Sequence, residues 1–223
     1  MSKLKAVYLV GTLKPSPKIS NTYTLSEFLA RHLHSHGVEN DIVRLIDYNI
    51  KPGTHTHVDN NNNNNDNDDD WPAILEKILA SQIIIFATPV WWGNQSSLIQ
   101  RAIERLDEIH DEIMNTGRSR MTNKVAGIVV TGDSDGAEHI IGNLVNFFIS
   151  LGFTIPAATT LTVLWSGQSK GSNKSREELW KYYEKTYASM AKGAAQNLAF
   201  MANLLKQNLC LILCTHNLNE RVA

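Results

Sequence analysis

Short apolar segments alternate along the chain with longer segments in which apolar residues recur every three or four positions. The short segments are rich in β-branched side chains and predict strands over residues 5–10, 41–46, 82–87, 124–130 and 159–164. The third of these contains Ile83, Ile84, Ile85 and Phe86 with no polar residue between them. Such a run is typical of a strand that is covered on both faces.

The longer segments predict helices, because their apolar residues fall on one face at helical spacing. Leu25, Phe28, Leu29 and Leu33 mark the first helix, which Gly37 would end as a C-terminal cap. The predicted helices span 22–36, 73–80, 97–114, 137–151 and 175–207, the last as one long helix or two broken ones.

Strands that alternate with helices predict a parallel sheet with helices on both faces, an α/β fold. Five strands and about five helices fit a three-layer, doubly wound, flavodoxin-like sheet with strand order 2-1-3-4-5. We expect a single domain over residues 1–208. The tail 209–223, which contains Cys210 and Cys214, has no assigned role.

Composition narrows the classes of function. The 223 residues carry 21 Lys and Arg against 22 Asp and Glu, so no basic excess favours binding to nucleic acid. No uncharged apolar run approaches the ~20 residues that cross a bilayer, and the N-terminus lacks the pattern of a secretory signal. With only two cysteines, these features predict a soluble cytoplasmic protein with neither a membrane nor a nucleic-acid partner.

One segment interrupts the pattern. Residues 59–70 consist of Asn and Asp alone, and such a polar run buries no apolar area, so we expect it to be a disordered insertion. A metal site with His55 and His57 is the alternative, and the sequence favours it less.

Ligands of open parallel sheets bind beyond the carboxyl ends of the strands, near the point where the strand order reverses. The loop after the first strand, residues 11–22, leads into a helix N-terminus, where backbone N–H groups favour a phosphate. Ser20, Asn21 and Thr22 can cap that helix, bind the phosphate, or do both, and Lys14 and Lys18 add charge. The loop lacks the second glycine of a Walker or dinucleotide-binding motif and the acid of a receiver domain.

Two further loops follow predicted strands. Residues 88–97 place Trp91 and Trp92 beside Pro89 and Gly93, and flat aromatic side chains in such a loop can stack on a flat ligand. A role of both indoles in the core or in a dimer interface is the alternative. Residues 131–136, Thr-Gly-Asp-Ser-Asp-Gly, are small and polar and suit backbone contacts with the edge of a ring.

Together the loops resemble those of FMN-dependent NAD(P)H oxidoreductases of flavodoxin-like fold, which include NADPH-dependent FMN reductases, multimeric flavodoxins of the tryptophan-repressor-binding-protein type and iron–sulfur flavoproteins. Gly11-Thr12-Leu13-Lys14 and Ser20-Asn21-Thr22 stand where that family reads G-S-x-R-x-x-S-N-T, and residues 88–97 match its T-P-[IV]-[YW]-x-G-x-x-S. The resemblance covers residues 4–165. Two departures are the residues 15–17, which lengthen the first loop, and the missing cysteine cluster of the iron–sulfur branch.

The resemblance implies a non-covalent FMN that takes hydride from NADPH or NADH and passes electrons to a small-molecule acceptor such as a quinone or a flavin, in ping-pong order. It implies no catalytic acid or base, no metal, and a homodimer or homotetramer. The FMN phosphate would lie on Thr12, Lys14, Ser20, Asn21 and Thr22. The isoalloxazine would lie against Pro89, Val90, Trp91, Trp92, Gly93 and Asn94, with Thr131, Gly132, Asp133 and Gly136 at its other edge.

Two alternatives stay open. A flavodoxin-type electron carrier would bind FMN without reacting with NAD(P)H, but its compact phosphate loop and strongly acidic surface fit poorly with the long first loop and the net charge of −1. A flavin-free protein-interaction domain is the second, and the Trp91–Trp92 loop argues against it.

Overall fold

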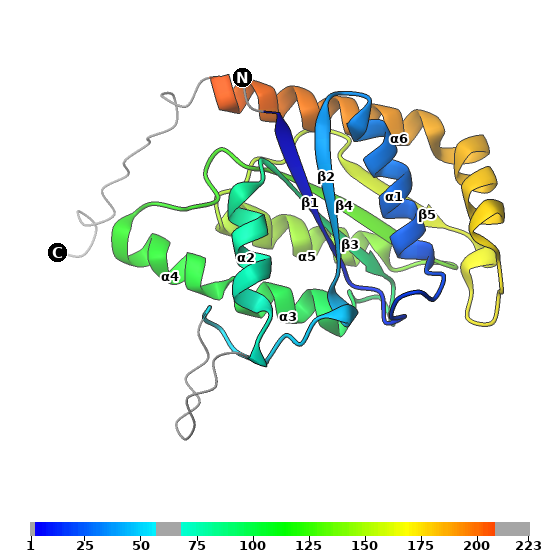
Figure 1. The fold of residues 1–223 in the computed structure, drawn as a ribbon, viewed down its shortest axis with the longest axis horizontal. Helices are drawn as coiled ribbons and strands as arrows, with labels where there is room; N and C mark the ends of the chain where they lie inside the picture. The colour runs from blue at the N-terminus through cyan, green and yellow to red at the C-terminus, as the bar shows by residue number, and fades with distance from the viewer. Residues whose placement is uncertain (1–2, 57–67, 208–223) are drawn as a thin grey trace.

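The computed structural model describes residues 3–56 and 68–207 (Figure 1). Its five parallel strands form one sheet in the order β2-β1-β3-β4-β5, which confirms the predicted flavodoxin-like topology. The strands are β1 (Leu4–Val10), β2 (Val38–Arg44), β3 (Ile83–Pro89), β4 (Val125–Gly132) and β5 (Thr160–Leu164). In the β1–β3 pairing Ala6 lies opposite Ile83, so both strands reach the same edge of the sheet.

Helices cover both faces of the sheet (Figure 1). One face carries α1 (Asn21–His34) and α6 (Arg176–Gln207), and the other carries α2 (Trp71–Ala80), α3 (Ser97–Arg105), α4 (Asp107–Thr116) and α5 (Ala137–Ser150). Short 3-10 turns follow two strands, η1 (Leu45–Asp47) after β2 and η3 (Ser166–Gln168) after β5. The last helix is continuous over 32 residues. No helix among the described residues is long and apolar enough to span a membrane.

The two cores meet at β3, as its unbroken apolar sequence predicts. Ile83 and Ile85 pack toward α1 and α6, while Ile84 and Phe86 pack toward the opposite helices. All four side chains are fully buried. Burial of a side chain of this size contributes about 1.5–3 kcal/mol, so this strand anchors both layers.

Apart from shifts of one or two residues at element ends, two predicted elements differ from the structure. The helix expected over 97–114 is interrupted at Leu106, because the N–H of Glu108 donates to Thr54 O at 3.1 Å and leaves the helical ladder. The second strand begins earlier than predicted, since Val38 already pairs with Leu4, and it ends at Arg44 before η1.

Most of the Asn/Asp run and the whole tail with Cys210 and Cys214 lie outside the described residues. Asp68, Asp69 and Asp70, at the end of the run, are described, and the expectation of disorder for the rest of the run stays a prediction. The carboxylate of Asp69 accepts a hydrogen bond from the buried Arg105 guanidinium at 2.7 Å, and Asp70 accepts the N–H of Asn49 at 2.7 Å. These bonds hold Asp69 and Asp70 against the rest of the described chain.

Candidate functional site

Three loops gather at the edge of the sheet where β1, β3 and β4 end (Figure 1). The N–H of Gly11 donates to Ala87 O at 2.8 Å, which joins the first loop to β3. The N–H of Val90 donates to Thr131 O at 2.8 Å, which joins the second loop to the third. The structure therefore brings together the three segments that the sequence singled out.

A cluster of buried hydroxyl groups forms the base of the first loop. Ser20 caps α1, because its Oγ accepts the N–H of Tyr23 at 3.2 Å. The same hydroxyl donates to Thr12 Oγ1 at 2.8 Å, and Thr12 Oγ1 also accepts the N–H of Lys14 at 3.3 Å. The hydroxyls of Thr22 and Thr131 lie 2.6 Å apart and tie α1 to the end of β4.

This cluster has donors left over for a ligand. Thr12 Oγ1 only accepts within the cluster, so its own proton is free, and the Thr22–Thr131 pair uses one of its two hydroxyl protons. The first N–H groups of α1 have no partner within the helix, and the cap satisfies only that of Tyr23. Free hydroxyl and N–H donors at a helix N-terminus are the groups that an anion such as phosphate requires.

The side chains of two predicted phosphate ligands take no part in this hydroxyl cluster. The Lys14 side chain is exposed, and the groups that it contributes to the loop's own bonds are its backbone N–H and carbonyl. The side-chain amide of Asn21 donates to Gln168 O at 3.2 Å, so this group holds a neighbouring segment. A direct role of either side chain in ligand binding stays a prediction.

The second loop is a tight hairpin turn. Trp91 and Asn94 exchange two backbone hydrogen bonds of 2.9 Å, and the central residues Trp92 and Gly93 have φ of +51° and +74°, the pattern of a type I′ turn. The Asn94 amide donates to Trp92 O at 3.0 Å, and Thr88 Oγ1 accepts the N–H of Ser96 at 2.9 Å. These bonds leave the N–H groups of Trp92 and Gly93 at the tip without an acceptor among the described residues.

Both indoles of this turn face outward. Trp92 is 96% exposed and Trp91 is 42% exposed, so neither belongs to the core. A bulky residue at positive φ is unusual and costs free energy, and an exposed indole buries no area in return. Such a combination points to a ligand or partner that the indole contacts.

The third loop packs against the second through glycines. A Cβ added to Gly136, which has φ of +88°, would lie 2.8 Å from Gly93 Cα, and one added to Gly132 would lie 3.1 Å from the Val90 side chain. Asp133 is exposed, and its carboxylate accepts the Ser134 hydroxyl at 3.3 Å. Small residues are thus required where the two loops meet.

A fourth segment, residues 165–168, borders the site and was missed by the sequence analysis. The N–H of Trp165 donates to Gly132 O at 3.0 Å, and Gln168 accepts from Asn21 and donates to Tyr183 Oη at 2.9 Å. Burial raises the pKa of Tyr183, so its hydroxyl stays protonated. The sequence could have indicated this segment, because it follows the predicted strand over residues 159–164, and parallel strands end at the same edge of the sheet.

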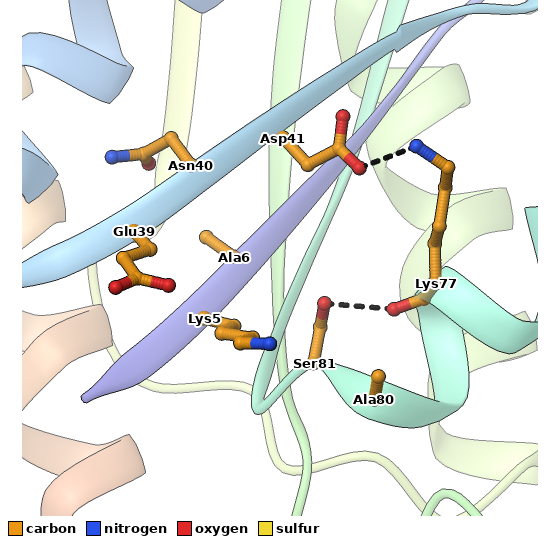
Figure 2. A pocket seen from close by; sticks show the side chains of 8 residues that line it. All are labelled: Lys5, Ala6, Glu39, Asn40, Asp41, Lys77, Ala80 and Ser81. Atoms are coloured by element: carbon orange, nitrogen blue, oxygen red, sulfur yellow. Dashed lines mark hydrogen bonds and ion pairs between the residues drawn. The ribbon is translucent and has the colours of Figure 1, made fainter. Parts of the chain in front are cut away.

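A separate cavity of about 240 Å³ lies at the opposite, amino-terminal edge of the sheet. Figure 2 shows the Lys77 ammonium on the Asp41 carboxylate there, 2.6 Å apart. Its lining residues are Lys5, Ala6, Glu39, Asn40, Asp41, Lys77, Ala80 and Ser81. None belongs to the loops described above. Among the described residues, no group of three His, Cys, Asp or Glu side chains could hold a metal ion.

The sequence matches the model of one protein family, described as NADPH-dependent FMN reductase, over residues 4–164. It is 32% identical to 8-demethyl-8-aminoriboflavin-5′-phosphate synthase of Streptomyces davaonensis over 69% of this chain and 60% of that protein. It is 31% identical to the divalent metal cation transporter MntH of Mycobacterium bovis, over 69% of this chain and 22% of that protein. The chain thus spans less than two thirds of either relative.

The structure is similar to that of RosB with bound 8-demethyl-8-formylriboflavin-5′-phosphate. The TM-score is 0.71 at 25% sequence identity, and the match covers 92% of this chain and 81% of RosB.

Replacement of Gly136 tests the close approach of the two loops. We expect Gly136→Ala to lower the free energy of unfolding by about 1–3 kcal/mol and to displace the second loop. The new methyl group would collide with Gly93, and alanine would be strained at the positive φ of position 136. Gly142→Ala on α5 is the matched control, since its Cβ meets nothing within 4 Å and alanine favours the helix. Urea unfolding of both variants checks this; equal stabilities would show that the loops are not in contact.

Replacement of Trp92 separates the indole from the turn that carries it. We expect Trp92→Gly to raise the free energy of unfolding by about 1 kcal/mol, because glycine relieves the left-handed backbone. The turn and its N–H donors remain, so a weaker affinity for FMN in the same variant would report contact with the indole. Urea unfolding and a fluorescence titration with FMN measure the two effects. A marked loss of stability would mean that the indole packs within the protein.

Proposed function

The chain belongs to the NADPH-dependent FMN reductase family, and we propose that it is a flavoenzyme that transfers electrons from NADPH or NADH through bound FMN to a small-molecule acceptor. A quinone or a second flavin is the acceptor class proposed. We further propose that it works as a homodimer or homotetramer, in ping-pong order.

One observation carries the proposal. The family match over residues 4–164 includes all three loops at the carboxyl edge of the sheet, and the first of them offers free hydroxyl and N–H donors at the N-terminus of α1. A flavodoxin-type carrier remains the alternative, and reaction with NAD(P)H separates the two.

The described residues fit the phosphate of FMN. The hydroxyls of Thr12 and of the Thr22–Thr131 pair, together with the first N–H groups of α1, would donate to its oxygens. Ser20 would keep Thr12 in place, and the exposed Lys14 would add positive charge at the rim. The remaining predicted contact, that of Asn21, would come from its backbone N–H, since its side chain binds Gln168.

The second and third loops fit the edge of a planar ring. The N–H groups of Trp92 and Gly93 would donate to ring heteroatoms, and Asn94 would hold the turn in shape. Such fixed donors stabilise negative charge where it develops, without reorganisation. When bound, FMN accepts hydride and returns electrons, so the protein itself supplies binding and electrostatics.

The other predicted contacts lie around this turn. Pro89 pairs with Thr131 across the sheet, Val90 packs beside Gly132 and Gly136, and the Trp91 and Trp92 indoles would provide flat apolar surface. Asp133 is exposed at the rim of the third loop. No side chain is assigned as an acid or base, because hydride transfer to a flavin needs none.

A second candidate is an enzyme whose substrate is a riboflavin 5′-phosphate. It is favoured by the 32% identity to 8-demethyl-8-aminoriboflavin-5′-phosphate synthase and by the likeness to RosB with its bound flavin phosphate. Both candidates use the same phosphate site, and they differ in whether the flavin is recovered unchanged.

The absorbance spectrum of the purified protein with FMN, followed by anaerobic addition of NADPH or NADH, tests the proposal. We expect bound flavin that either nucleotide bleaches quickly and an acceptor restores, with FMN of unchanged mass recovered afterwards. Bound flavin that stays oxidised would indicate the electron carrier. A flavin of altered mass would favour the second candidate, and no binding would contradict the proposed function.

A further inference from the structure

Arg44 lies buried beneath the first loop. This last residue of β2 is only 8% exposed, and its Nη1 donates to Lys18 O at 3.1 Å and, more weakly, to Lys14 O at 3.4 Å. Its guanidinium carbon lies 4.1 Å from the centre of the Tyr23 ring, in the first turn of α1. A single side chain from the neighbouring strand thus contacts both halves of the loop and the helix that follows.

The charge of Arg44 is not neutralised by direct pairing. Within the part of the chain that the structure describes, no carboxylate lies within ion-pair distance of its guanidinium, and its buried Nε has no acceptor. The carbonyls of Lys14 and Lys18 and the Tyr23 ring solvate the cation, but they leave its net charge uncompensated by any direct ion pair, and a buried charge in that state costs free energy. An anion bound above the loop would gain from the charge.

Asp47 holds the middle of the same loop. Its carboxylate accepts the N–H of Ser16 at 2.9 Å and the Ser16 hydroxyl at 2.5 Å. Partial burial acts to raise the pKa of Asp47, but the bonds from Ser16 and the nearby Arg44 charge outweigh it and lower the pKa. Hydrogen bonds therefore hold residues 14–18 at both ends, through Arg44, and in the middle, through Asp47.

The hydrogen bonds of Arg44 and Asp47 also affect the hydroxyl cluster of Thr12 and Ser20, which lies at the two ends of the loop. Residues 13–19 are exposed and form no helix or strand, while Thr12 and Ser20 at their two ends share a hydrogen bond of 2.8 Å. An untethered loop of this length would lose conformational entropy on closing around a ligand. Because residues 14–18 are fixed on the end of β2, the loop loses this conformational entropy when the protein folds, and not when the ligand binds.

We propose that Arg44 is a positioning residue of the phosphate site, which fixes residues 14–18 so that Thr12, Ser20 and the N-terminus of α1 are preorganised, and whose unpaired charge favours a phosphate. The inference rests on the proposed function. It adds a residue from outside the loop that selects a phosphorylated flavin over an unphosphorylated one.

The test compares FMN with riboflavin, which lacks the phosphate, in Arg44→Met, Arg44→Lys and wild-type protein. We expect the ratio of the riboflavin Kd to the FMN Kd to fall about 10-fold in Arg44→Met, the scale of one hydrogen bond to a charged group. Arg44→Lys retains charge but not the planar fork, so we expect it to recover part of the ratio. Fluorescence titration measures both constants.

Arg31→Met is the matched control. The guanidinium carbon of Arg31 also lies against aromatic rings, 5.0 Å from the centre of the Phe28 ring, but Arg31 is at the far end of α1. Its ratio should equal that of the wild type. If Arg44→Met fails to fold, Asp47→Asn carries the same test, since it loosens the loop through Ser16.

An Arg44→Met protein that binds both flavins with the wild-type ratio would overturn the inference, even if both affinities fell, because a merely structural role affects the two ligands equally. Failure of the proposed function gives a different result. In that case the wild-type protein itself would bind no FMN, and the inference would fall with it.

Discussion

In a sheet that is buried on both faces, polar groups can stay available to a ligand where the strands end and the chain leaves the sheet. β3 and β4 are buried along almost their whole length, so a free donor on either face would lack both water and a partner. At the carboxyl edge the chain leaves the sheet, and there the first turn of α1 and the hairpin tip at Trp92 keep N–H groups free. The position of the candidate site follows from this constraint.

The loops at this edge are held by close packing as well as by hydrogen bonds. Gly11 lies against Ser96 and Ile99, and Gly136 lies against Gly93, at distances that leave no room for a side chain. The pair Thr22–Thr131 joins the first loop to the third across the sheet. These contacts fix the loops relative to one another, as binding of a rigid, phosphorylated ring requires.

Much of this architecture could be predicted from the sequence, because the strong signals are local. The apolar run at residues 83–86 marks a strand buried on both faces, and the alternation of strands with helices fits the observed strand order. The three loops are short segments that directly follow predicted strands. Two features could not be predicted, because each depends on a backbone carbonyl far away in sequence. The helix break at Leu106 depends on Thr54 O, and the contact of Arg44 with the first loop depends on Lys18 O. The charge of Lys14 suggests a phosphate ligand within the loop, whereas the buried cation that contacts the loop is Arg44, at the end of β2.

An experimental structure of the protein with bound FMN would show directly whether the carboxyl edge of the sheet holds the flavin. We expect the phosphate within hydrogen-bond distance of Thr12 and of the first turn of α1, and the ring beside the tip at Trp92 and Gly93. We expect no flavin in the cavity at the amino-terminal edge around Lys77 (Figure 2). A phosphate bound elsewhere, with the Thr12–Ser20 cluster unchanged, would contradict this placement of the site.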